Sequence, residues 1–191
     1  TIDGSEGGTG AAPVEFSNRL GTPCIEATYY INQVLVGAGL RDQIRLISAG
    51  QTASGFDMLE KIALGADTVN AARSMMIALG CVQAKACNTN ECPTGIATQN
   101  PARARAIDLK EKSERVKNFQ RTTVHAFIEL CGAMGFSNPS DLSPSDIISR
   151  LEGRATNFDQ MFEPLIENQL HSDNIPNSYR DDWHKASAEY F

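Results

Sequence analysis

Apolar residues recur at helical spacing in the first half of the chain, and short apolar runs that end on small residues lie between these stretches. In the segment 26–39 the apolar positions fall three or four residues apart and glycines mark the exit, so we expect a helix that covers a sheet. The segment 45–50 is typical of a short strand, 51–55 of a loop and 56–64 of a helix. This pattern predicts a βα unit.

The same order of strand and helix repeats directly along the chain. The segment 67–72 predicts a buried strand, and 73–80 predicts a short helix rich in methionine. Two consecutive βα units favour a parallel sheet, in which the carboxyl ends of the strands meet at one edge. Small residues stand at both of these ends, at Gly50 and at Ala71-Ala72, where backbone N–H groups can cradle a phosphate. Tight packing alone is the alternative interpretation of these small residues.

In the second half, apolar residues recur every three or four positions over 116–134, which predicts a long helix. The basic-rich segment 101–117 before it is interpreted as a solvated surface, because its charges do not share one helical face. Ser143 before a proline predicts the cap of a short helix over 144–151. From residue 153 onward, polar residues and isolated aromatics are typical of a tail that packs on a larger surface.

The composition is that of an ordinary globular protein. The chain has 191 residues, of which 41% are hydrophobic and 21% charged. A formal net charge of −6 without a basic stripe argues against nucleic acid as a partner. No apolar run of the sequence approaches the roughly 20 residues that a membrane span requires. We therefore expect no nucleic acid, no membrane in this part of the chain, and a cytoplasmic location.

The first residues form a strand-like stub that runs into a glycine-rich loop at 4–10. Glycines let backbone N–H groups approach a ligand closely, and the carboxyl end of a strand is where α/β folds place substrates. A plain flexible turn is the alternative interpretation. A chain that begins so abruptly in a strand also leads us to expect a part cut from a longer protein.

Three of the five cysteines fall within one segment, Cys81 to Pro93, with the spacing C-x5-C-x4-C-P. Three thiols from one loop match the three irons of a [3Fe-4S] centre, with one thiolate for each iron. Zinc is the rival, although a structural zinc site usually takes four ligands and the histidines lie far away in the sequence. Uncommitted thiols are the third interpretation, and the spacing alone leaves all three open. Cys24 and Cys131 are interpreted as small buried hydrophobes.

Three runs of sequence together resemble one known family. They are IDGSEGGTGAAP at 2–13, SAGQTASGFDMLEKIALGADTVNAARSMMIALGC at 48–81 and CVQAKACNTNECPTGIATQ at 81–99. In this order they resemble the C-terminal part of the flavin and iron-sulfur domain of glutamate synthase, over residues 1–135. Among the members of this family, the chain is most similar to short glutamate synthase-like proteins that lack the glutamine-hydrolysing domain.

The resemblance implies the C-terminal portion of a (β/α)8 TIM barrel, with about three βα units, a cysteine cluster loop and an extended C-terminal tail. Residues 1–135 would belong to the barrel domain, and residues 136–191 would form an extension that packs on it. The remaining barrel strands would come from the parent chain or from a partner, because an incomplete barrel leaves sheet edges exposed.

The resemblance also implies FMN at the carboxyl ends of the barrel strands and a [3Fe-4S] cluster beside it. The three cluster ligands of the family match Cys81, Cys87 and Cys92. The phosphate-cradling segments of the family match Ser48, Ala49, Gly50, Gln51, Ala71, Ala72 and Arg73. The substrate contacts would come from Gly7, Gly8, Thr9 and Gly10. No catalytic side chain is identified, because the chemistry would belong to the flavin.

The activity that the resemblance implies is that of an oxidoreductase of glutamate synthase type, which acts on CH-NH2 donors in nitrogen metabolism. Electrons from ferredoxin or from an NADPH-dependent subunit would pass via the cluster and FMN to the imine of 2-oxoglutarate, and the product would be glutamate. The ammonia would be free or derived from glutamine. The alternatives are an N-methylglutamate synthase-like enzyme and a non-catalytic electron-transfer subunit. Residues 1–191 alone are expected to be inactive.

Overall fold

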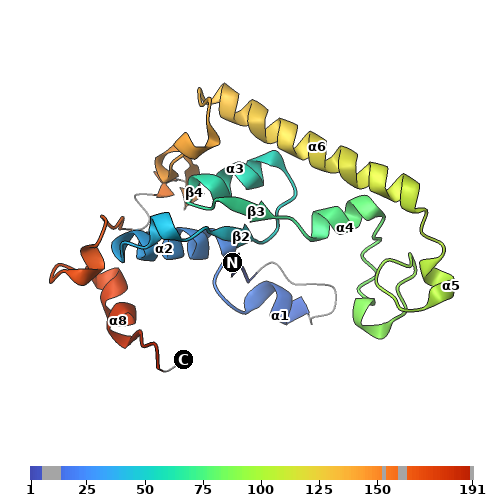
Figure 1. The fold of residues 1–191 in the computed structure, drawn as a ribbon, viewed down its shortest axis with the longest axis horizontal. Coiled ribbons are helices and arrows are strands. Elements are labelled where there is room, and N and C mark those ends of the chain that lie inside the picture. The colour runs from blue at the N-terminus through green and yellow to red at the C-terminus, as the bar shows by residue number, and fades with distance from the viewer. Residues whose placement is uncertain (6–13, 152–153, 159–162, 190–191) are drawn as a thin grey trace.

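A small parallel sheet lies at the centre of the computed structural model, and helices pack around it (Figure 1). The structure describes four segments of the chain, which are residues 1–5, 14–151, 154–158 and 163–189. Within these segments, three strands pair in parallel in the order β1-β2-β3, with the bounds Ile2–Asp3, Ile47–Ala49 and Thr68–Asn70. The predicted α/β class and the parallel sheet are confirmed, and the closed barrel stays a prediction.

The helices of the first half agree closely with the periodicity of the sequence. After the short α1 (Val14–Arg19), α2 (Cys24–Gly37) precedes β2, α3 (Gly55–Ala63) follows it, and α4 (Arg73–Leu79) follows β3. The two predicted βα units, β2-α3 and β3-α4, are therefore present. Short 3₁₀ turns complete the connections, at Arg41–Gln43, Cys87–Thr89, Pro139–Asp141, Pro144–Asp146 and Gln169–His171.

The register of the sheet brings the carboxyl ends of its strands side by side. Asp3 pairs with Ala49, and Ala49 pairs with Asn70. The chain therefore leaves β2 at Gly50 and β3 at Ala71 along the same edge. In parallel α/β sheets this is the edge at which ligands bind.

The helix α6 (Leu109–Ala133) runs across α3 and α4 (Figure 1). The prediction that it starts at residue 116 was wrong, because the Asp108 carboxylate accepts a hydrogen bond from Glu111 N–H at 3.0 Å and caps a polar first turn. The predicted solvated surface at 101–117 contains α5 (Pro101–Ala104) and the exposed first turns of α6. In the described part of the chain, no helix combines the length and the apolar character that crossing a membrane requires.

The main hydrophobic core lies between α2, α3, α6 and the segments that follow α6. Its buried members are Tyr29, Leu59, Ala63, Leu64, Phe127, Cys131, Leu142, Ile147 and Phe158. The predicted burial of Cys24 and Cys131 is confirmed, and Cys131 packs in the apolar core, whereas the Cys24 thiol also donates to Ala49 O at 3.3 Å. The axes of α3 and α6 approach so closely at Gly55 that an added Cβ would lie 2.5 Å from the Phe127 nitrogen.

The segment after α6 departs from the helix predicted over 144–151. The expected cap forms at Ser143, but a single 3₁₀ turn follows it instead of an α-helix. The chain then forms an antiparallel hairpin of two strands, β4 (Ile148–Leu151) and β5 (Arg154–Asn157). Ile147 has an extended backbone and is buried in the core, so burial of this β-branched side chain outweighs the local helical signal.

The C-terminal segment packs on α2. Its buried apolar residues are Leu165, Leu170, Ile175 and Tyr179, the last of which lies on α8 (Asn177–Lys185). The rings of Tyr30 and Tyr179 stack with their centroids 5.1 Å apart, and the Tyr30 hydroxyl donates to Asp182 at 2.9 Å. Gln33 of α2 accepts a hydrogen bond from Leu165 N–H at 2.8 Å. The division into domains at residue 135 stays a prediction.

Replacing Gly55 with alanine tests the contact between α3 and α6. The added methyl group would overlap the α6 backbone, so we expect G55A to lower the free energy of unfolding by about 1–3 kcal/mol, the usual cost of overpacking. Chemical unfolding followed by circular dichroism measures the loss. Gly132 lies on α6 itself and has nothing within 4 Å of an added Cβ, so G132A is the matched control and should be slightly stabilising. Wild-type stability in G55A would contradict the described packing.

Asp67 joins the start of β2 to the start of β3. Its carboxylate accepts hydrogen bonds from Leu46 N–H at 2.6 Å and from the Arg41 guanidinium at 2.9 Å, and Arg45 lies 3.4 Å away. Burial by itself would raise the pKa of Asp67, but the Leu46 N–H group and the two arginines outweigh it and lower this pKa. The charged form of Asp67 therefore stabilises the sheet.

The pH dependence of stability tests this role of Asp67. Because its pKa is lower in the folded than in the unfolded state, the stabilisation is present above about pH 4 and is lost as the pH falls through the folded-state pKa. We expect D67N to cost about 1.5–3 kcal/mol at neutral pH, the range for hydrogen bonds to a charged group, and to flatten the acid limb of the stability curve. D42N, at an exposed carboxylate, is the control. If the stability of D67N and of wild type fell equally as the pH is lowered, the charged form of Asp67 would not stabilise the sheet.

Candidate functional site

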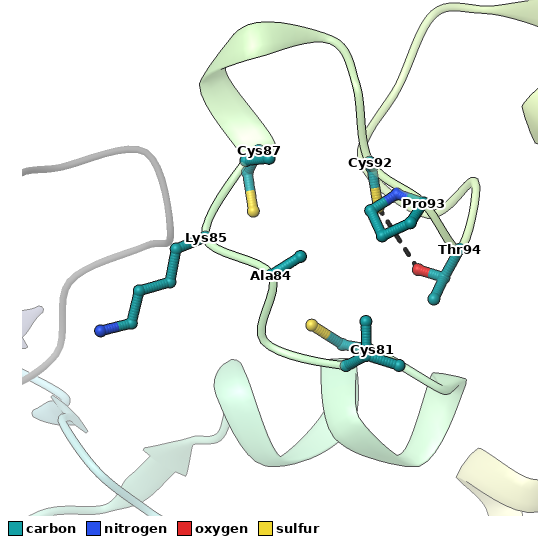
Figure 2. Close-up of a pocket in the computed structure, with 9 residues that line it drawn as sticks. Cys81, Ala84, Lys85, Cys87, Cys92, Pro93 and Thr94 are labelled. Atoms are coloured by element: carbon teal, nitrogen blue, oxygen red, sulfur yellow. Dashed lines mark hydrogen bonds between the residues drawn. The ribbon is translucent and has the colours of Figure 1, made fainter.

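The loop after α4 turns repeatedly because of its backbone conformation. Among the described residues from 80 to 95, those with positive φ are Gly80, Gln83, Lys85, Asn90 and Gly95. They fold the loop around a pocket whose lining residues all lie between 81 and 94. Figure 2 shows Cys81, Cys87 and Cys92 around this pocket. The structure thus brings the three predicted thiols to one place, and their role as metal ligands stays a prediction.

Each of the three cysteines is held by a different local feature. Cys81 follows α4 directly, and its Sγ accepts a hydrogen bond from Gln83 N–H at 3.4 Å. Cys87 opens a 3₁₀ turn. Cys92 is only 8% exposed, and the Thr94 hydroxyl lies 3.3 Å from its Sγ. The three sulfur atoms therefore stand in unequal surroundings.

Hydrogen-bond donors around Cys92 favour its ionised form. The Thr94 hydroxyl, followed by the backbone N–H groups of Ala97, Thr94 and Ile96, lowers the pKa of Cys92 to about 7 and outweighs the opposing effect of burial. In contrast, burial raises the pKa of Cys131 in the main core. Because thiolates and not thiols bind metals, the surroundings of Cys92 favour the form that a metal ligand requires, whereas those of Cys131 disfavour it.

The far side of the loop is anchored to the chain that follows it. Asn90 Oδ1 accepts hydrogen bonds from Gln99 N–H and from Thr98 Oγ1, and Thr98 Oγ1 also donates to the Asn90 carbonyl at 2.7 Å. Gly95 has a φ of 78° and packs against Arg103, where an added Cβ would overlap the carbonyl oxygen. The residues after Cys92 therefore fix the shape of the pocket.

Basic side chains lie beside the start of the loop. Lys112 and Arg115 of α6 fill the space next to Gly80, and Lys85 lines the pocket itself. Glu111 forms ion pairs with Lys112 at 3.3 Å and with Arg115 at 3.7 Å, which offsets part of this charge. The Lys85 side chain points away from the three sulfur atoms (Figure 2), so these basic residues do not form an anion site inside the pocket.

No three His, Cys, Asp or Glu side chains in the described ranges lie close enough together to hold a single metal ion. A [3Fe-4S] cluster sets a different geometric requirement, because each thiolate binds its own iron and the ligand sulfurs surround the cluster. The donor set at the pocket consists of three thiols from one loop, two of which take part in hydrogen bonds. This donor set fits an iron-sulfur cluster.

The predicted phosphate-binding segments lie next to one another at the edge of the sheet. Ser48 and Ala49 are the last two residues of β2, and Gly50 and Gln51 follow them. Ala71 and Ala72 follow β3, and Arg73 begins α4. The N-terminus of α3 is closed by its own capping box, in which Asp57 accepts hydrogen bonds from two backbone N–H groups. The N-terminus of α4 at Ala72 has no side-chain cap. This edge therefore leaves the start of α4 as the better position for an anion.

The side chain of Ser48 points away from that edge. Its Oγ lies 2.8 Å from Thr28 Oγ1 and 3.2 Å from Cys24 Sγ, and all three residues are buried between β2 and α2. An added Cβ at Gly50 would lie 2.8 Å from Cys24 Cβ, so glycine is required there for packing. Close packing is therefore one role of the small residue at Gly50, and the phosphate-binding role stays a prediction.

The predicted substrate contacts at Gly7, Gly8, Thr9 and Gly10 lie outside the described residues. Gly4, at the start of the same loop, is described, and its N–H donates to Ala49 O at 2.9 Å as β1 ends. The loop therefore leaves the sheet beside the strand end that precedes Gly50.

Sequence reasoning missed Thr94 as part of the site. Its hydroxyl contacts the sulfur of the cysteine two residues earlier, a local arrangement that serine and threonine often adopt toward nearby polar groups. A hydroxyl residue two positions after a candidate ligand was the available signal.

Comparison with known proteins assigns the chain to a family. A family model described as the conserved region in glutamate synthase matches residues 1–137. The chain belongs to the glutamate synthase family. The matched region contains the whole sheet, the cysteine loop and α6.

Individual members of the glutamate synthase family are similar over more than half of the chain. The glutamate synthase large subunit-like protein YerD of Bacillus subtilis is 36% identical over 87% of the chain, which corresponds to 32% of that protein. The archaeal glutamate synthase [NADPH] of Methanocaldococcus jannaschii is 39% identical over 74% of the chain and 28% of its own length. The ferredoxin-dependent glutamate synthase 1 of Arabidopsis thaliana is 41% identical over 51% of the chain and 6% of that protein. The chain thus spans less than a third of these relatives.

Replacing Gly95 with alanine tests how the turn after Cys92 supports the pocket. Alanine would be strained at a φ of 78° and would overlap the Arg103 carbonyl, so if the three thiols hold iron as predicted, we expect G95A to lose most of it. Gly135 is the matched control, because its φ of 90° imposes similar strain while nothing lies within 4 Å of an added Cβ. Iron content per chain after anaerobic purification should fall in G95A and stay unchanged in G135A. Equal iron in both variants would contradict the proposed support.

Proposed function

We propose that this chain is the part of a glutamate synthase-type oxidoreductase that holds a [3Fe-4S] cluster and FMN, in an enzyme that converts 2-oxoglutarate and ammonia to glutamate. The observation that carries the proposal is the three-thiol pocket directly after a βα unit, within the region that matches the family. The sheet is small and parallel, which is compatible with a piece of a (β/α)8 barrel. Strands from outside this chain would complete such a barrel.

Cys81, Cys87 and Cys92 would hold the cluster with one thiolate for each iron. Hydrogen bonds to the sulfur atoms of Cys81 and Cys92 support this assignment, because they stabilise thiolates. Among the described residues, the lining of the pocket contains three thiols and neither an imidazole nor a carboxylate. A structural zinc site usually takes four ligands, so iron fits this lining better.

The two neighbouring strand ends would hold the phosphate of FMN. Backbone N–H groups around Gly50-Gln51 and Ala71-Ala72 can point toward an anion there, and the exposed Arg73 adds positive charge at the start of α4. The Ser48 hydroxyl is directed toward Thr28 and Cys24 and not toward the proposed phosphate. Ser48 and Ala49 would therefore contribute only by holding the end of β2 in place.

When bound, the cluster and the flavin would supply one-electron transfer and hydride transfer, respectively. The side chains of this chain would hold, orient and shield these groups. Gly7, Gly8, Thr9 and Gly10 would admit the substrate beside the flavin. The electron donor would be ferredoxin or an NADPH-dependent subunit, and the names of the relatives include both kinds.

Metal and flavin analysis tests the cofactor assignment. The intact protein that contains this chain, purified without oxygen, should hold about three irons and four sulfides for each FMN. We expect C87S to lose most of its iron, because a three-thiol site has no spare ligand. C131A removes a buried cysteine of the main core and is the matched control that keeps the iron. A colourless protein loaded with zinc would contradict the assignment.

The same purified protein tests the reaction. Reduced ferredoxin or NADPH with its reductase, 2-oxoglutarate and ammonia should give glutamate and consume two electrons for each molecule formed. Turnover only with methylamine would replace the proposed substrate and indicate an N-methylglutamate synthase-like enzyme. Failure with both amines in protein that holds both cofactors would indicate an electron-transfer subunit.

A further inference from the structure

The three thiols of the pocket differ in the hydrogen bonds that reach their sulfur atoms. Cys92 Sγ has the Thr94 hydroxyl at 3.3 Å and the backbone N–H groups of Thr94, Ile96 and Ala97 around it. Cys81 Sγ accepts one N–H bond, from Gln83 at 3.4 Å. Within the described part of the chain, no hydrogen bond to Cys87 Sγ is found. Polar stabilisation of the site is therefore concentrated on Cys92.

We propose that Thr94 is a positioning residue whose hydroxyl donates to the Cys92 thiolate and raises the reduction potential of the iron-sulfur cluster, an inference that rests on the proposed function. A metal-bound thiolate carries no proton, so the hydroxyl must be the donor of the contact between Thr94 and Cys92. One-electron reduction by the donor protein adds one negative charge and changes no covalent bond. A hydrogen bond to a ligand sulfur stabilises that added charge.

Partial burial of the contact between Thr94 and Cys92 limits the access of water to this hydroxyl. Cys92 is 8% exposed, and Thr94 is half-buried in the pocket lining beside it. Among the groups that donate to Cys92 Sγ, the Thr94 hydroxyl is the one that belongs to a side chain. The others are backbone N–H groups of the same turn. Removing the hydroxyl should therefore leave the thiolate with its backbone bonds only. Hydrogen bonds to ionised acceptors are about twice as strong as neutral ones, so the loss should be measurable.

A purely structural role for Thr94 predicts a different outcome. In that case the hydroxyl would only shape the loop, and its removal would reduce how much cluster the protein retains without changing the potential of the cluster that remains. Thr89 offers the comparison, because it lies in the same loop and its hydroxyl donates to Ala86 O at 2.9 Å instead of to a sulfur. Replacement of Thr89 by valine perturbs the loop in the same chemical manner.

The experiment is a redox titration of the intact protein and its T94V, T94S and T89V variants, followed by electron paramagnetic resonance of the oxidised cluster. We expect T94V to lower the equilibrium constant for reduction about tenfold, which is about 59 mV for a one-electron couple. T94S keeps the hydroxyl and should retain the wild-type potential. T89V should also retain it, even if the variant holds less cluster.

Each outcome decides the inference. A potential in T94V equal to that of wild type overturns it, and so does an equal shift in T89V. Should T94V lose the cluster, T94A repeats the comparison with a smaller side chain. Loss of the cluster in both T94V and T94A, with a retained cluster in T94S, overturns the inference as well. The hydroxyl would then be needed for the cluster to bind and not for its potential. A wild-type protein without an iron-sulfur signal overturns the proposed function itself, whereas a bound cluster with an unshifted potential overturns only the role of Thr94.

Discussion

Parallel pairing between β2 and β3 places Ala49 beside Asn70, so both strands deliver the chain to the same edge of the sheet. From this edge, α3 and α4 leave toward the same neighbour, α6, and pack against it. The cysteine loop begins where α4 ends, so its position depends on that pairing as well. The carboxyl end of β3 and the thiol pocket are therefore separated by one short helix, Arg73–Leu79.

The sequence was most informative where apolar periodicity and burial agree. The helix at 56–64 could be predicted, because it buries an apolar face against α6. The helix at 26–39 and the two strands form as well, although the fully buried face of α2 includes the polar Thr28 and Gln33, and the predicted buried strand β3 is exposed at Thr68 and Asn70. The hairpin of β4 and β5 could not, since the burial of Ile147 is a tertiary effect that a local serine cap does not reveal. The early start of α6 could not be predicted because its first turns are mostly charged, and the apolar Leu109 among them is exposed.

The candidate site divides in a similar way. The cysteine spacing was sufficient to predict that three thiols meet in one loop. Five residues with left-handed backbone conformation fold that loop within a short stretch of chain. The spacing could not reveal which sulfur is stabilised as a thiolate, because that depends on the orientation of the Thr94 hydroxyl and of three backbone N–H groups. Nor could it show that Ser48 turns its hydroxyl toward α2, which follows from the alternation of side chains along β2.

The lining of the thiol pocket comes entirely from one continuous stretch of chain, residues 81–94. Relative motion between the sheet and the C-terminal segment, or opening of the fold elsewhere, would carry the three sulfur atoms together as one unit. Their mutual spacing is thus set by local backbone turns, which respond little to slow collective motions. In evolutionary terms, insertions in distant connections can change what approaches the pocket while the pocket itself stays intact.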